Sequence, residues 1–132
     1  MATDPRELIK RYIQSVGERR LEALPPMLED DASFTLGDNT LTGRDAFVNA
    51  FRRLLPIIER NDIRHLFVDA DEACVVYDFV TNTAVGPVLS VEHIKLRNGR
   101  IAASTLVFER LHWPEVLEEL KQRQMNTAVA AA

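Results

Sequence analysis

Apolar residues recur along this chain with two periods, a helical one in the first half and an alternating one in the second. The first helical stripe consists of Ile9, Tyr12, Ile13 and Val16. Asp4 and Pro5 precede it in the positions that favour a helix cap and a first helical turn. The pattern therefore predicts a helix that begins near Pro5 and ends at Gly17.

The segment between this helix and residue 60 predicts a second helical segment with Leu21, Leu24, Met27 and Leu28, then one short strand and a third helix. Pro25 and Pro26 keep any helix after Gly17 short or broken, because each proline removes a backbone donor. Residues 30–36 predict a strand, followed by a turn around residues 37–39. A helix is predicted after Gly43, and Pro56 is expected to kink or shorten its last turn. The apolar face of this predicted helix is Phe47, Ala50, Phe51, Leu54 and Ile58.

The second half of the chain predicts an antiparallel meander. Four runs rich in apolar and β-branched residues cover residues 63–69, 73–83, 88–97 and 101–109. The connections between them are short, and Asn98-Gly99 favours a type I′ hairpin turn. A last helix is predicted from Trp113, and residues 126–132 are expected to be a disordered tail. Helices early and strands late predict an α+β fold with helices on one face of a strongly curved sheet.

Composition places the chain among single-domain globular proteins. It has 132 residues, of which 46% are hydrophobic, and we expect one domain over residues 1–125. A net charge of −4 without a basic run argues against a nucleic-acid surface. Cys74 is the only cysteine, so an internal disulfide is impossible and a reducing compartment fits. The absence of a signal-peptide core or a membrane-length apolar run leads us to expect a cytoplasmic protein with no membrane partner.

A lone acid interrupts the third predicted strand of the meander. Alternation places Glu92 on the same face as Ser90 and Ile94, and places Leu89, Val91 and His93 on the other face. Neither face is plainly the core face by composition, so the alternation alone leaves the direction of Glu92 open.

Six short motifs make the chain similar to the nuclear transport factor 2-like superfamily, in particular to its SnoaL-like branch. They are RYI (11–13), LEDDASF (28–34), LTGRDA (41–46), RH (64–65), DEA (71–73) and RNGRI (97–101). The resemblance covers residues 5–117 and rests on the order and spacing of the motifs together. It implies a cone-shaped fold, in which a curved mixed or antiparallel sheet wraps around the N-terminal helices and a C-terminal helix closes the cone. It also implies a deep apolar pocket and, in most members, a dimer.

The resemblance further implies three candidate catalytic residues. The ketosteroid isomerase branch has a pocket acid at the position that matches Glu92 and a pocket tyrosine at the position that matches Tyr12. In those enzymes a tyrosine and a protonated acid hold a developing enolate oxygen. His65 matches a histidine of many SnoaL-like proteins, and a neutral imidazole can act as a base near physiological pH. The general base of the isomerases falls at Leu36, and an acid of the limonene epoxide hydrolases falls at Leu106, so neither named activity is expected.

Each candidate also has a purely structural interpretation. Tyr12 fits an amphipathic core residue with its hydroxyl group at the rim. His65 fits a histidine at the edge of the core, bonded to a backbone carbonyl. Glu92 fits an exposed strand charge or one member of an ion pair.

The resemblance implies that Glu92 points into the pocket. Alternation on the neighbouring strands then determines which of their residues also point inward. The ligand-binding residues predicted on this basis are Phe34, Leu36, Phe51, Tyr77, Phe79, Ser90, Ser104 and Leu106. The histidines are scattered and no acid lies at ligand spacing, so neither a metal site nor a cofactor is predicted. The alternate residues of these strands then form an apolar outer face, which includes Val76, Val91, Ile101 and Val107. An exposed apolar face of this kind predicts a homodimer through it.

These inferences together predict a protein that binds an apolar small molecule. If it is an enzyme, we expect cofactor-independent isomerase, cyclase or dehydratase chemistry on a carbonyl-bearing substrate. Tyr12 and Glu92 would polarise the oxygen, and His65 would move the proton. The alternative is a non-catalytic ligand-binding or scaffolding dimer of the same fold.

Overall fold

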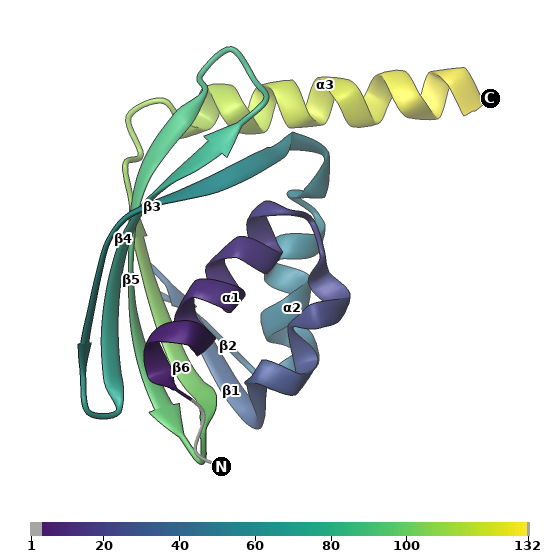
Figure 1. The fold of residues 1–132 in the computed structure, drawn as a ribbon. Helices are drawn as coiled ribbons and strands as arrows, with labels where there is room; N and C mark the ends of the chain where they lie inside the picture. Colours follow the sequence, from purple (N-terminus) through teal and green to yellow (C-terminus); the bar gives the residue numbers. More distant parts are fainter. Residues whose placement is uncertain (1–3, 132) are drawn as a thin grey trace.

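Within residues 4–131, the part of the chain that the computed structural model describes, six strands form one curved sheet (Figure 1). The strands are β1 (Leu28–Leu36), β2 (Asn39–Thr42), β3 (Ile58–Asp69), β4 (Glu72–Thr81), β5 (Pro87–Arg97) and β6 (Arg100–Phe108). The α-helices are α1 (Pro5–Gly17), α2 (Arg44–Arg52) and α3 (Trp113–Ala131), and single 3-10 turns lie at Leu21–Ala23, Pro25–Met27 and Leu55–Ile57. The predicted α+β cone is confirmed: α1 and α2 lie on the concave face of the sheet, and α3 crosses one end.

The order of the strands in the sheet is β2-β1-β6-β5-β4-β3. Strands β3 to β6 form the predicted antiparallel meander, whereas β1 pairs in parallel with β6. This parallel pair sets Phe34 beside Ser104 and Leu36 beside Leu106. Residues far apart in the chain therefore share the concave face of one continuous sheet.

The ends of α1 are formed as the sequence predicts. The Asp4 carboxylate accepts a hydrogen bond of 3.0 Å from the backbone N–H of Arg6, and Pro5 occupies the first turn. The predicted stripe faces the core and is buried. Gly17 ends the helix against β3, where an added Cβ would lie 2.5 Å from the backbone nitrogen of Asn61. The Asn61 side chain donates to the Ile13 carbonyl at 2.9 Å, so helix and strand are joined at this close approach.

The β5–β6 hairpin also follows the local prediction. Asn98 and Gly99 have φ angles of 57° and 72°, the two positive values that a type I′ turn requires. Arg97 and Asn98 both donate to the Glu29 carboxylate at 3.1 Å, which attaches the tip of the hairpin to β1. Arg97 also pairs with Asp31. The turn is thus set by its own sequence and held by the neighbouring strand.

Three local predictions differ from the structure. Strand β2 was not predicted, because all four of its residues are exposed and its pattern carries no alternation in burial. Ile58 is the first residue of β3 rather than part of a helical face, since α2 ends at Arg52 and a 3-10 turn containing Pro56 follows. Ile101 is fully buried rather than outward, because the β5–β6 register shifts between Lys95 and Leu96.

The C-terminal segment is helical where the sequence predicts a disordered tail. Helix α3 continues to Ala131, and its second half extends beyond the rest of the molecule (Figure 1). Three of the six residues from 126 to 131 are alanine, the best helix former, and they extend a helix that begins at Trp113. Residue 132 of the predicted tail lies outside the described residues.

Candidate functional site

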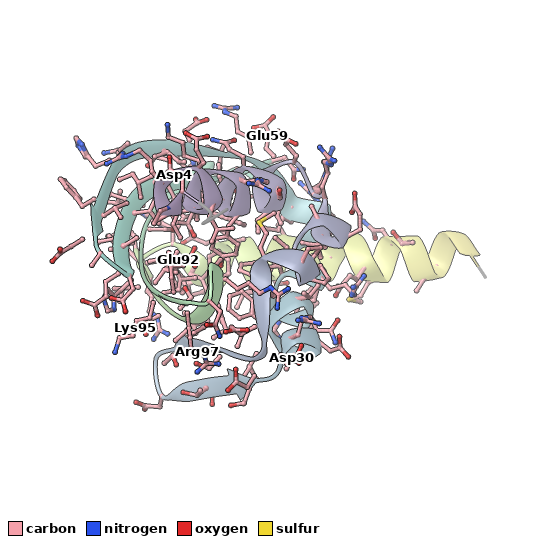
Figure 2. The ribbon with its side chains drawn as sticks, turned by 60° about the horizontal axis from the view of Figure 1, so that its bottom comes forward. Asp4, Asp30, Glu59, Glu92, Lys95 and Arg97 are labelled. Carbon is pink, nitrogen blue, oxygen red and sulfur yellow. The ribbon has the colours of Figure 1, made fainter. Side chains whose placement is uncertain are left out.

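Glu92 points into the interior of the cone. Figure 2 shows it enclosed by the curve of the sheet and α1, while the labelled Glu59 and Lys95 lie toward the periphery. Only 1% of its surface is exposed, and its same-face neighbours Ser90 and Ile94 are buried as well. The alternation of β5 therefore has its even-numbered residues on the concave face.

Three hydroxyl groups converge on the Glu92 carboxyl group. The Tyr12 and Ser104 hydroxyls each donate to Oε1 at 2.7 Å, and the Tyr77 hydroxyl donates to Oε2 at 2.6 Å. Tyr12 belongs to α1, Tyr77 to β4 and Ser104 to β6. Tyr77 and Ser104 are diagonal cross-strand neighbours of Glu92, since Glu92 pairs directly with other residues on both adjacent strands. We call these four residues the Glu92 cluster.

Burial governs the protonation of the Glu92 cluster. Desolvation raises the pKa of Glu92 above its ordinary value of 4.5, and the hydrogen bonds from Tyr77, Ser104 and Tyr12 offset this rise only in part. Desolvation, followed by the negative charge of Glu92, raises the pKa values of Tyr12 and Tyr77 well above 10.0. Both phenols therefore remain protonated donors, and the carboxyl group is shifted toward its neutral form.

An apolar pocket of about 790 Å³ adjoins the Glu92 cluster. Its walls come from α2, α3 and every strand except β3, and they are mostly aliphatic and aromatic. Every residue predicted to bind a ligand lines this pocket except Ser104; these lining residues are Phe34, Leu36, Phe51, Tyr77, Phe79, Ser90 and Leu106. Ser104 instead donates to Glu92 behind the pocket wall.

Tyr77 joins the pocket to the Glu92 cluster. Among the described residues it is the member of the cluster that lines the pocket, while Tyr12, Glu92 and Ser104 lie behind the wall. The structure thus brings Tyr12 and Glu92 together, but they hydrogen-bond each other instead of both facing a ligand. The alternation of β4 indicates that Tyr77 faces inward, whereas its contact with Glu92 depends on the register of two strands.

Packed aromatic rings hold the pocket walls. Phe34 contacts Phe47 and Phe51 edge to face, with ring centroids 5.2 Å apart in both pairs. Trp113 packs on Phe108 at 4.9 Å and lines the pocket from the start of α3. Edge-to-face rings resist displacement, so the cavity has a defined shape.

His65 does not reach this site. It is exposed, stacks on Phe67 with ring centroids 6.0 Å apart, and pairs with the outward-facing Val76. The register of β3 shifts between Ile63, which pairs with the inward Tyr77, and His65, so His65 lies on the outer face. The structure therefore gives His65 no contact with a substrate in the pocket.

Other kinds of site are not found in the described part of the chain. Between residues 4 and 131, no group of His, Cys, Asp and Glu side chains is arranged to hold a metal ion. No described helix is long and apolar enough to cross a membrane. The Glu92 cluster and the adjoining pocket remain the candidate site.

Comparison with known proteins places the fold. Residues 9–104 match the model of the SnoaL-like domain family. A steroid delta-isomerase from Pseudomonas aeruginosa is 15% identical, with a TM-score of 0.72 over 97% of this chain and 97% of that chain. An NTF2-like protein of unknown function from Cytophaga hutchinsonii is also 15% identical, with a TM-score of 0.69 over 83% of this chain and 94% of the other.

A designed protein has a similar fold. A de novo designed protein with a curved β-sheet is 18% identical, with a TM-score of 0.75 over 89% of this chain and 93% of that one. No curated protein matches the chain in sequence. Because a natural isomerase and a designed protein both resemble the chain at low identity, the likeness shows the fold alone.

Proposed function

Because this chain belongs to the SnoaL-like domain family, we propose that it binds an apolar small molecule whose carbonyl oxygen accepts a hydrogen bond from Tyr77. One observation carries the proposal: the buried Glu92 carboxyl group is hydrogen-bonded to the one cluster residue, within 4–131, that lines the pocket. The apolar walls bind a ligand by burying its surface but do not fix its orientation. Tyr77 supplies the polar contact that orients it.

The chemistry depends on the neutral form of Glu92. A protonated carboxyl group can donate its proton to the Tyr77 oxygen, which leaves the Tyr77 proton free to point into the pocket. Tyr12 and Ser104 keep the other carboxyl oxygen in place, so the donor is oriented before a ligand arrives. A fixed donor in an apolar site stabilises negative charge that develops on a carbonyl oxygen, as in enolate formation. Isomerase-like chemistry is therefore the reaction type that the cluster favours.

A matched pair of ligands tests the proposed contact. The bicyclic ketone 2-tetralone and the hydrocarbon tetralin differ in the carbonyl group, and Trp113, the only tryptophan of the chain, lines the pocket and reports binding by its fluorescence. The expected result is that Tyr77→Phe lowers the affinity for 2-tetralone about fivefold relative to tetralin, as the loss of about 1 kcal/mol predicts. Tetralin affinity should remain unchanged in the same variant. An unchanged affinity ratio would contradict the assigned role of Tyr77.

A second candidate function is ligand binding without turnover. Leu36 and Leu106 line the pocket at the two positions where the resemblance places acids in related enzymes. Among the described lining residues there is no carboxylate or imidazole that could remove a proton. Deuterium exchange at the α-carbons of 2-tetralone, followed by NMR, separates the candidates. Exchange that the protein accelerates and Tyr77→Phe slows supports the enzyme, while saturable binding without accelerated exchange supports a binding protein.

We also propose that two copies of the chain pair through the outer face of the sheet. Val91 pairs with Val76 on one side and with Val107 on the other, which forms an apolar row across three strands. Val107 is 65% exposed and the nearby Leu89 is 44% exposed, while α1 and α2 cover the opposite face (Figure 1). A stable interface of about 800 Å² per partner would remove this row from water.

A further inference from the structure

We infer that the ligand of this pocket carries an anionic group, such as a carboxylate, which Arg53 and Lys121 bind at the exposed part of the pocket. The inference rests on the proposed function and deepens it, because it adds a second recognised group to an apolar carbonyl compound. The ligand would then extend from Tyr77 at the inner wall to the two cations near solvent.

The charges that line the pocket are of one sign. The chain has 20 acidic residues and 16 lysines and arginines, yet the charged residues in the lining are Arg53 and Lys121. Random sampling of this composition would favour acids slightly. Two cations with no acid in the lining are the arrangement expected for a site that accepts an anion.

Neither cation is used elsewhere in the described structure. Other arginines are held in ion pairs, for example Arg44 with Asp30 at 2.6 Å and Arg64 with Asp78 at 2.9 Å. Within residues 4–131, Arg53 and Lys121 take part in no ion pair and in no side-chain hydrogen bond. Both side chains are exposed, so their charges are available to a ligand.

Helical spacing directs both cations to the same pocket. Asn49 and Arg53 are four residues apart at the end of α2, and Leu117 and Lys121 are four residues apart on α3, and all four line the cavity. The Gln124 amide lies on the same face of α3 and lines the pocket too. Two helices thus present cations, with amide donors beside them, around one opening.

The end of α2 opposes the two positive charges only in part. Helix α2 ends at Arg52, so its carboxyl end places a partial charge of about −0.5 near Arg53. Two full positive charges outweigh that partial charge. An anionic group would bind near solvent, where it keeps part of its hydration, whereas the apolar inner wall would strongly disfavour it. The charge pattern therefore also sets the orientation of the ligand.

Three probes separate this inference from the proposed function. The probes are 10-oxoundecanoic acid, its methyl ester, and undecanoic acid, which lacks the ketone. Dissociation constants for the full chain would be measured by calorimetry or by Trp113 fluorescence. We expect the keto acid to bind about tenfold more tightly than its ester, because two exposed ion pairs contribute about threefold each. This preference should weaken at high salt.

The variants test the two cations directly. Arg53→Gln combined with Lys121→Gln should abolish the preference for acid over ester and leave ester affinity unchanged. Arg52→Gln is a matched control for the first site, because Arg52 is adjacent in sequence but lines a different surface hollow and donates to Asn49 at 3.0 Å. The control should keep the preference of the wild type.

The outcomes distinguish the two proposals. Equal affinity for the keto acid and its ester, or a preference that survives the double substitution, overturns the anion site. Equal affinity for the keto acid and undecanoic acid, with the acid–ester preference intact, overturns carbonyl recognition and leaves the anion site standing. If none of the three probes binds, both proposals fail.

Discussion

Replacing Glu92 by glutamine removes the titratable carboxyl group of the buried cluster while keeping its shape. The carboxyl group is 1% exposed and accepts hydrogen bonds from Tyr12, Ser104 and Tyr77. A glutamine keeps one oxygen acceptor but presents an amide nitrogen in place of the second. That nitrogen can donate to the Tyr77 oxygen as a protonated carboxyl group does, so glutamine reproduces the neutral form of Glu92 but not its negative form.

The negative form of Glu92 makes the stability of the wild type depend on pH. Burial raises the pKa of Glu92 above 4.5, so in the window between 4.5 and the raised pKa the folded protein keeps a proton that the unfolded chain has released. The stability of the wild type therefore falls as the pH rises through this window, by about 1.4 kcal/mol for each unit by which the pKa is raised. Glu92→Gln lacks this titration, so the variant gains relative to the wild type as the pH rises.

The assay is urea unfolding of both proteins, followed by circular dichroism and by Trp113 emission. At about pH 4, where Glu92 is neutral, we expect the two proteins to be about equally stable, and by about pH 8 we expect the variant to exceed the wild type. Glu59→Gln is the matched control, because Glu59 is exposed on β3 at the periphery (Figure 2). The difference in unfolding free energy between Glu59→Gln and the wild type should not change with pH in this way.

A pH-independent difference would contradict the raised pKa of Glu92. If the stability difference between Glu92→Gln and the wild type is constant from about pH 4 to about pH 8, or moves in favour of the wild type, desolvation does not govern this carboxyl group. The three hydroxyl donors would then outweigh burial. The proposed role of a neutral Glu92 as the donor behind Tyr77 would have to be abandoned.

Three further substitutions test other contacts. Tyr12→Phe removes one donor to Glu92 and should lower the unfolding free energy by about 1–2 kcal/mol near neutral pH; a loss in urea unfolding below about 0.5 kcal/mol would show that this bond matters little. Gly17→Ala should destabilise by about 2 kcal/mol, because the clash with the Asn61 backbone outweighs a helix-propensity gain of up to about 1 kcal/mol; an unchanged melting temperature would contradict the close approach. Val91→Lys should convert a dimer into a monomer or insoluble protein in sedimentation velocity, and a wild-type chain that sediments as a monomer would rule out the proposed interface.

Features with a local cause could be predicted from the sequence. The start of α1 depends on Asp4 and Pro5, and the β5–β6 turn depends on Asn98-Gly99, so each is decided by neighbouring residues. The meander follows from alternation and short connections. The pocket lining was mostly predictable, because once Glu92 faces inward, pairing between neighbouring strands sets the facing residues.

The face of the sheet on which a side chain lies could not be predicted beyond an irregularity in a strand. Period-two alternation assumes an unbroken ladder, and one extra residue reverses the face of every residue that follows. His65 follows such a shift in β3 and lies outside, and Ile101 lies beside the β5–β6 shift and is buried. Nothing in the local sequence pattern marks either irregularity.

The α+β class, the order of most elements and the apolar character of the pocket walls follow from the residue pattern alone. Which polar groups meet depends on the folded arrangement of distant segments. Tyr12 reaches Glu92 across 80 residues of chain, and Ser104 and Tyr77 reach it from the two adjacent strands. The parallel pairing of β1 with β6 and the packing of α2 and α3 around one opening are likewise long-range. Such contacts depend on how helices dock on a curved sheet, and the free energy of docking is shared among many core residues rather than encoded in any one stretch.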